Sequence, residues 1–356
     1  MADANFNADI TVNLYTTAQA VERAVFGAGA IATDDVEVGF SETYRLYESN
    51  TELQADDDVS TAGKAQGAAY FAQDQHPKKL FILSVDYNAG GTELGTSLDA
   101  AYADIREAGE DFYGLCCASR LDADWVELGT WAAANSKLVF GQSDDADTKD
   151  ATDPNPLSTM AATSNKHFVS VWHDDDAEYA DIAWMAKVLA ADPDQRATVA
   201  YDKTLTGITA PTGLTSTNKT NIIADGGNLY LPFFGNAVMR PGKASDGSWI
   251  DSVILGDWVK ARIAEDIAQY LQNQSSLGRK VPYTAAGIAE IAAVIRSRLL
   301  SGVQLGHFDA DTVYVTEPDI DTISAATKAT RLLTIEAGAT EAGGIYGVTC
   351  NVGIEV

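Results

Sequence analysis

Short apolar runs alternate with longer amphipathic stretches between residues 79 and 190, and this alternation constrains the fold more than any other feature of the sequence. Strands that alternate with helices of this length form parallel sheets covered by helices on both faces. We therefore expect an α/β fold with a helix-covered, mostly parallel sheet. The spacing predicts strands at 79–85, 111–118, 138–140, 166–172 and 198–201, with helices at 92–108, 121–134 and 177–190.

The second half of the chain has a different pattern. A segment rich in Thr, Gly, Pro and Asn at 204–220 predicts a linker or an extended crossover. A hairpin at 228–239, turning at Gly235 and Asn236, and two amphipathic helices indicate a smaller α+β part. The helices are expected over 255–273 and from the N-cap Thr284 to Gly302, and strands over 312–316 and 331–335.

Both ends of the chain have the alternation typical of strands. Apolar residues occupy every second position near the amino terminus and again at the carboxyl terminus, so each end presents one apolar face. Such strands can add to sheet edges of neighbouring molecules or pair within their own subunit, and the pattern leaves both open. The apolar positions are Ile10, Val12, Leu14, Tyr346, Val348, Val352 and Ile354. We expect four parts: an amino-terminal strand arm at 1–20, an α/β lobe at 21–203, an α+β lobe at 204–340 and a carboxyl-terminal strand arm at 341–356.

The formal charge of −27 limits the partners of this protein. So acidic a surface repels phosphate backbones and anionic lipids, which disfavours nucleic-acid and membrane binding. No 18-residue apolar window or signal-peptide pattern is present, and three cysteines make no disulfide framework, so we expect cytoplasmic synthesis. The acid excess is carried mostly by Asp. That bias fits a halophilic host or an ordinary acidic surface, and the sequence leaves both open.

No pattern of catalytic, cofactor-binding or metal-binding residues emerges. Gly90 and Gly91 follow a predicted strand but lack the rest of a phosphate-binding motif. We expect Asp174–Asp176 to form a solvated turn and the 143–164 segment a polar loop, although the sequence leaves open whether Asp174–Asp176 or the acidic 143–153 stretch holds a cation. Cys116 and Cys117 lie in an apolar strand, where Cys packs as a small hydrophobe. We expect a protein that is not an enzyme.

Basic side chains slightly outnumber acidic ones between residues 240 and 300, in an otherwise acidic chain. A cationic strip of this kind could face an acidic partner. Ordinary ion pairing along helix faces would give the same composition, and the sequence leaves both interpretations open.

The same region carries a family resemblance. Its spaced Gly, Trp, Asp, Arg, Pro-Tyr and Gly positions resemble the tail-sheath proteins of contractile-tailed viruses, over about residues 60–310. Ala285 departs from the pattern, which usually has an acidic residue there. The matching positions are Gly242, Trp249, Asp251, Asp257, Trp258, Arg262, Val281, Pro282, Tyr283, Gly287, Ile288 and Gly302.

This resemblance implies a structural protein of the virion. Sheath subunits form stacked hexameric rings around a tail tube, linked by strand arms that pair with neighbouring subunits, and they contract to drive the tube through the host envelope. The implied partners are further copies of the chain, the tail tube protein, and baseplate and tail terminator proteins. In such proteins the two helices of the α+β lobe face the tube, so the expected tube-facing residues are Lys260, Arg262, Arg296 and Arg298. A sheath of a genome-free injection particle would have the same subunit, and an α/β ligand-binding enzyme is the remaining alternative.

Overall fold

The computed structural model describes residues 23–34, 39–87, 93–118, 122–150, 152 and 154–346. These residues belong to two compact units that divide after Ala268, within helix α9 (Ile250–Ser276). The larger unit holds the described residues up to 268, and the smaller unit holds 269–346. We expected the boundary between the two lobes at residue 203, before the last two strands of the large sheet.

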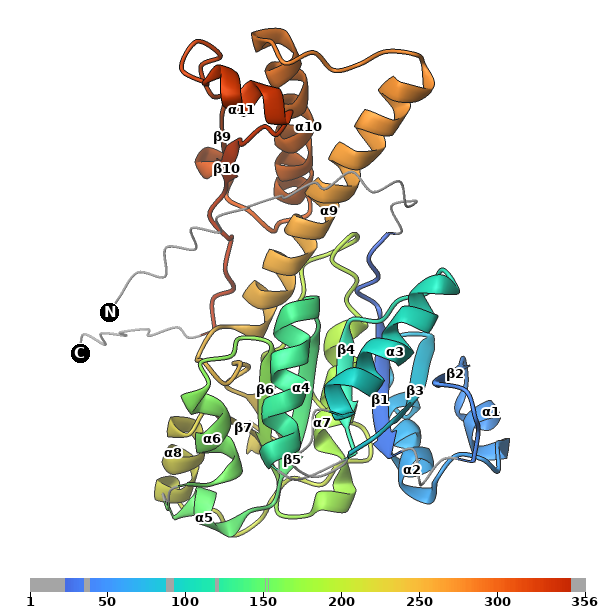
Figure 1. Cartoon of the computed structure of the whole chain (residues 1–356). Helices are drawn as coiled ribbons and strands as arrows, with labels where there is room; N and C mark the ends of the chain where they lie inside the picture. Colours follow the sequence, from blue (N-terminus) through green and yellow to red (C-terminus); the bar gives the residue numbers. More distant parts are fainter. Residues whose placement is uncertain are drawn as a thin grey trace, which may run out of the picture. The chain divides into compact units, whose positions relative to one another are not determined.

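An eight-stranded sheet runs through the larger unit (Figure 1). The strand order is β2-β3-β1-β4-β5-β6-β7-β8. The inner strands are all parallel, whereas β2 and β8 pair antiparallel at the two edges. This arrangement confirms the expected α/β class. The strands are β1 (Ala28–Asp34), β2 (Tyr44–Tyr47), β3 (Lys79–Val85), β4 (Gly114–Cys117), β5 (Leu138–Ser143), β6 (Phe168–Trp172), β7 (Gly227–Phe233) and β8 (Asn236–Arg240).

Helices cover both faces of this sheet. One face packs against α3, α4, α6 and α8, and the other against α2 and α7. Gly29 in β1 permits the second contact, because an added Cβ would lie 2.8 Å from Cε of Met185 and 2.9 Å from Cε2 of Tyr70. The helices are α1 (Asn50–Ala55), α2 (Thr61–Phe71), α3 (Glu93–Glu107), α4 (Asp122–Asn135), α5 (Ala146–Lys149), α6 (Pro156–Ala162), α7 (Ala180–Leu189) and α8 (Ser216–Ala224), with a 3-10 turn at Asp176–Glu178.

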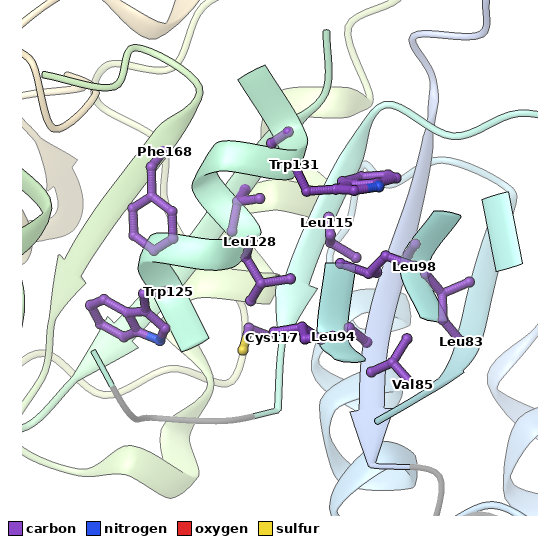
Figure 2. Close-up of a cluster of buried hydrophobic side chains, with 14 of the residues drawn as sticks. Leu83, Val85, Leu94, Leu98, Leu115, Cys117, Trp125, Leu128, Trp131 and Phe168 are labelled. Atoms are coloured by element: carbon purple, nitrogen blue, oxygen red, sulfur yellow. The ribbon is translucent and has the colours of Figure 1, made fainter. Parts of the chain in front are cut away.

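The core under α3 and α4 is built from large apolar side chains (Figure 2). Trp125, Leu128 and Trp131 recur at helical spacing on α4 and are all buried against Leu115 and Cys117 of β4 and their neighbours. Burying one such side chain stabilises the fold by about 1.5–3 kcal/mol. The apolar periodicity of the sequence is therefore the source of this layer.

Three predicted elements are corrected by the structure. Residues 198–201 form no strand, and the carbonyl of Ala200 accepts a hydrogen bond from Nε1 of Trp184. The polar 143–164 segment is not only a loop: it contains α5 and α6, and Asn155 caps α6 through a capping box with Ser158. The predicted 331–335 strand is also absent, because the ladder forms later, at β10.

The smaller unit has α10 beside a two-stranded antiparallel sheet, together with α11 and the end of α9. Thr284 caps α10 as expected, accepting from the amide of Gly287. In the sheet, Val315 pairs with Ala337, and an isolated bridge between Phe308 and Glu341 extends the ribbon. Its elements are α10 (Ala285–Gln304), a 3-10 turn (Ala310–Thr312), β9 (Tyr314–Thr316), α11 (Ala325–Thr330) and β10 (Glu336–Gly338).

Candidate functional site

The candidate assembly strands fall mostly beyond the described part of the chain. Ile10, Val12 and Leu14 lie outside the described residues, and so do the carboxyl-terminal positions. Tyr346 is described and is half-buried. Strand exchange between subunits therefore stays a prediction. The carboxyl-terminal positions outside the described residues are Val348, Val352 and Ile354.

The β9–β10 sheet is the described feature best suited to receive such strands. Each of its two strands has one side that pairs with no further strand of the described chain. A two-stranded sheet is at best marginally stable alone, and an unpaired strand edge is a template for another strand. The unit that contains it also leaves large apolar side chains at the surface, namely Leu277, Leu300, Tyr314, Leu332 and Ile345.

A second exposed apolar feature is the tip of the β7–β8 hairpin. Phe233 and Phe234 stack edge to face there, and Phe234 is 92% exposed. The guanidinium carbon of Arg240 lies 3.5 Å from the Phe233 ring centroid, and its Nε donates to Oδ1 of Asp202 at 2.6 Å. Arg240 therefore covers one face of the Phe233 ring, which stays 40% exposed, while Phe234 remains open to solvent.

The four predicted tube-facing residues do not share one environment. Lys260 is exposed on α9. Arg296 is exposed on α10 and donates from Nη2 to the carbonyl of Val315 at 3.3 Å, whereas Arg298 is half-buried. Positions two apart on a helix differ by about 200° around its axis, so Arg296 and Arg298 do not form one stripe.

Arg262 is corrected from a surface residue to a buried one, at 2% exposure. Its Nε and Nη2 donate to the two carboxylate oxygens of Asp194 at 3.0 and 2.7 Å, and its Nη1 donates to both carboxylate oxygens of Glu265. Burial alone would raise the pKa of Asp194, but hydrogen bonds from Arg262 and from Nε1 of Trp258 hold that pKa below its usual value. A group enclosed in this way cannot present its charge to a tube.

The acidic turns after β5 and β6 are occupied by local hydrogen bonds. Asp145 Oδ1 accepts from the amide of Asp147, and Asp175 Oδ1 accepts from the amide of Ala177. Asp174 Oδ2 accepts from the amide of Thr212 at 3.3 Å. The residues that the structure describes contain no cluster of three or more side chains able to hold a metal ion.

Two buried polar pairs lie at the end of the sheet near α9. The Tyr113 hydroxyl donates to Oδ2 of Asp257 at 2.7 Å, and Nε2 of His167 lies 3.1 Å from the same oxygen. Lys137 Nζ donates to Oδ1 of Asp111 at 2.6 Å. Burial lowers the pKa of Lys137 although Asp111 opposes the change, and burial raises the pKa of Tyr113 well above its usual value.

Comparisons with known proteins decide the fold. No protein-family model matches the chain, and no curated protein sequence matches it. Solved structures do match. The contracted helical sheath of the anti-feeding prophage is 12% identical, with a TM-score of 0.64 over 97% of this chain and 99% of that one. The chain has the fold of a contractile sheath subunit.

Two further structures carry the same sheath fold. The contracted sheath complex of PVC, an extracellular contractile injection system, is 11% identical, with a TM-score of 0.61 over 95% of this chain and 97% of that one. The sheath tail protein of Listeria innocua is 9% identical, with a TM-score of 0.53 over 84% and 89%. At these identities the likeness establishes the fold. Among the described residues, no helix combines the length and the apolar composition that a membrane-spanning helix needs.

Sequence reasoning missed the partners of Arg262 within this sheath fold. Asp194 is 68 positions from Arg262, and Ala24 is 238 positions from it. The composition of residues 240–300 does not indicate the contact of Arg262 with Asp194 or its contact with Ala24. One signal was available, because a guanidinium between Trp258 and Glu265 on an apolar helix suggests pairing rather than exposure.

Proposed function

We propose that this chain is the subunit of a contractile sheath, which polymerises around a tail tube and drives the tube through a cell envelope when it contracts. One observation carries the proposal: the likeness in fold to a sheath chain covers 97% of this chain and 99% of the other. The role is mechanical and involves no catalytic step.

In this proposal, stacked hexameric rings are connected by strands exchanged between copies. The open β9–β10 sheet and its exposed apolar neighbours support this, because both gain from a partner strand. We infer that residues 10–14 and 346–354 supply the added strands. The remaining partners are a tail tube protein, a baseplate protein and a tail terminator, and the assembled protein belongs to the tail of a virion.

A genome-free contractile particle is the second candidate. The anti-feeding prophage and PVC particles supply sheath structures of this fold, and PVC is described as an extracellular contractile injection system. Nuclease treatment of particles from the native source distinguishes the two. Protected DNA in the particle supports a virus, and its absence supports an injection particle.

Negative-stain imaging of the purified full chain tests assembly. We expect rings or tubes. Deletion of residues 1–16 or 345–356 should leave a folded core with unchanged circular dichroism that forms neither. Tubes from either truncated chain would contradict strand exchange.

A point variant with a matched control makes the same test without shortening the chain. Val12→Asp puts a charge on the apolar face of the predicted strand, whereas Asn13→Asp puts it on the opposite face. We expect Val12→Asp to abolish tubes and Asn13→Asp to preserve them. Equal behaviour of the two variants would contradict the predicted strand face.

A further inference from the structure

The first four described residues, 23–26, are hydrogen-bonded to the body of the larger unit through the side chains of Arg262, Glu265 and Asp111. The backbone of Ala24 is held on both sides: its amide donates to Oε1 of Glu265 at 2.7 Å, and its carbonyl accepts from Nη2 of Arg262 at 2.9 Å. The amide of Val25 donates to Oδ2 of Asp111 at 3.2 Å. These contacts connect residues 23–26 with α9 and with Asp111, which precedes β4.

Arg262 is the centre of this arrangement. A guanidinium has five N–H donors in a fixed fork, and here each has an acceptor: two on Asp194, two on Glu265 and one on the carbonyl of Ala24. Arg23 adds a second cation, 2.9 Å from Oδ2 of Asp194. The two cations balance the two carboxylates, which lowers the cost of burying the Arg262 guanidinium, while Arg23 itself lies at the surface.

Aromatic contacts complete the attachment. The Phe26 ring is 4.9 Å from the ring of Tyr113, centroid to centroid, and the guanidinium carbon of Arg262 lies 5.4 Å from the Phe26 centroid. Phe26 is buried. Residues 23–26 therefore have both polar and apolar anchors before β1 begins at Ala28.

We propose that Arg262 is a positioning residue that clamps residues 23–26 to α9 and so fixes where the amino-terminal arm starts. The inference rests on the proposed function, in which residues 10–14 pair with another copy. An extended chain spans at most about 3.5 Å per residue, so release of these four residues would lengthen the connection between copies by up to about 14 Å. The clamp thus limits how far the arm can extend. A force that pulls on the arm acts on the larger unit at α9.

Arg262→Lys is the informative variant, because it keeps the positive charge but cannot reproduce the five-donor fork. Glu265→Gln is the second variant, since it keeps an oxygen for the Ala24 amide and removes the ion pair. Lys260→Gln is the matched control: Lys260 is exposed, two positions from Arg262 on the same helix.

Hydrogen exchange on the unpolymerised full chain measures the clamp directly. Hydrogen bonds to charged groups contribute about 1.5–3 kcal/mol, so Arg262→Lys should accelerate exchange at the Ala24 and Val25 amides by about 10-fold or more. Glu265→Gln should give a smaller increase, and Lys260→Gln none. The amides of Ile82 and Phe140 in the core strands are the reference and should not change. If Arg262→Lys also accelerates exchange at Ile82 and Phe140, the substitution has destabilised the whole unit. The exchange rates of Glu265→Gln at Ala24 and Val25 then decide whether the clamp exists.

Assembly is the second measurement. We expect Arg262→Lys to give tubes with irregular subunit spacing or none. The control for assembly is Gln272→Ala, an exposed position of the same helix outside the predicted tube contact, which should give regular tubes. Unchanged exchange at Ala24 and Val25 would overturn the clamp. Regular Arg262→Lys tubes despite faster exchange would overturn its role in setting the reach of the arm. If the unmodified chain forms no tubes, the proposed function fails, whereas the exchange rates still decide whether the clamp exists.

Discussion

Tyr113 and Asp257, 144 positions apart, share a buried hydrogen bond of 2.7 Å from the phenol hydroxyl to Oδ2. The pair joins the residue before β4 to α9, and His167 lies against the same carboxylate. Because α9 also carries Arg262 and Glu265, this contact and the clamp fix the same helix to the sheet.

Asp257→Ala should destabilise the larger unit. The substitution leaves the Tyr113 hydroxyl and the His167 ring without their shared acceptor in a buried site, which costs about 2–4 kcal/mol. Urea unfolding followed by circular dichroism measures the change, with the exposed Lys260→Ala on the same helix as the control. Equal midpoints for the two variants would show that the Asp257 pair contributes nothing.

Strong alkali should destabilise the fold through its buried tyrosines. Burial raises the pKa of Tyr70, Tyr87 and Tyr113 well above the usual value near 10. In the unfolded chain these phenols ionise near pH 10, whereas in the folded chain they keep their protons, so the stability that they contribute is present below pH 10 and is lost above it.

The size of the alkaline effect follows from proton counting. Each buried tyrosine should lower the free energy of unfolding by about 1.4 kcal/mol per pH unit above pH 10. Tyr113→Phe should remove one such contribution and make the decline shallower. Denaturant midpoints between pH 9 and 11.5 measure both slopes, and identical slopes in the variant and the unmodified chain would contradict the assignment.

Salt should stabilise the protein if the acidic surface is an adaptation to a saline cell. With a formal charge of −27, repulsion between carboxylates is strong at low ionic strength and is screened at 1 M, where the Debye length is about 3 Å. Thermal unfolding at low salt and in molar KCl tests this, and the melting temperature should rise by several degrees. No rise would leave an ordinary acidic surface as the explanation.

The tube-contact hypothesis now rests on Lys260, Arg296 and Arg298 without Arg262. Arg296→Glu combined with Arg298→Glu should impair assembly on purified tubes while the chain stays folded, because charge reversal opposes an acidic partner. The control is Arg279→Glu with Lys280→Glu, an exposed pair in the same unit with the same change in charge. Co-sedimentation with tubes is the measurement, and normal assembly of the first variant would end the hypothesis.

Elements with a clear apolar pattern were predicted well from the sequence, whereas a strand built from small residues was not predicted. β3 occupies 79–85 as expected, because its apolar run is continuous. β1 was not recognised, although it is an inner strand, because it is built largely from Ala and Gly, which have weak strand preference. Gly29 is required by the approach of Met185 and Tyr70, which are distant in sequence.

The candidate site was predictable only in part, for a similar reason. Exposure of Lys260 and Arg296 follows from their helix faces, but the burial of Arg262 depends on Asp194 and Ala24, which lie on other segments. The apolar pattern of a helix indicates which of its faces is buried. It does not indicate which charged residue forms ion pairs with residues far away in the sequence.

The most direct test of the central claim is a cryo-EM map of the polymer that resolves both ends of the chain. The account predicts that residues 10–14 and 346–354 of one copy lie as strands on sheets of neighbouring copies, next to β9 or β10. A map in which both ends pair with strands of their own copy would contradict it.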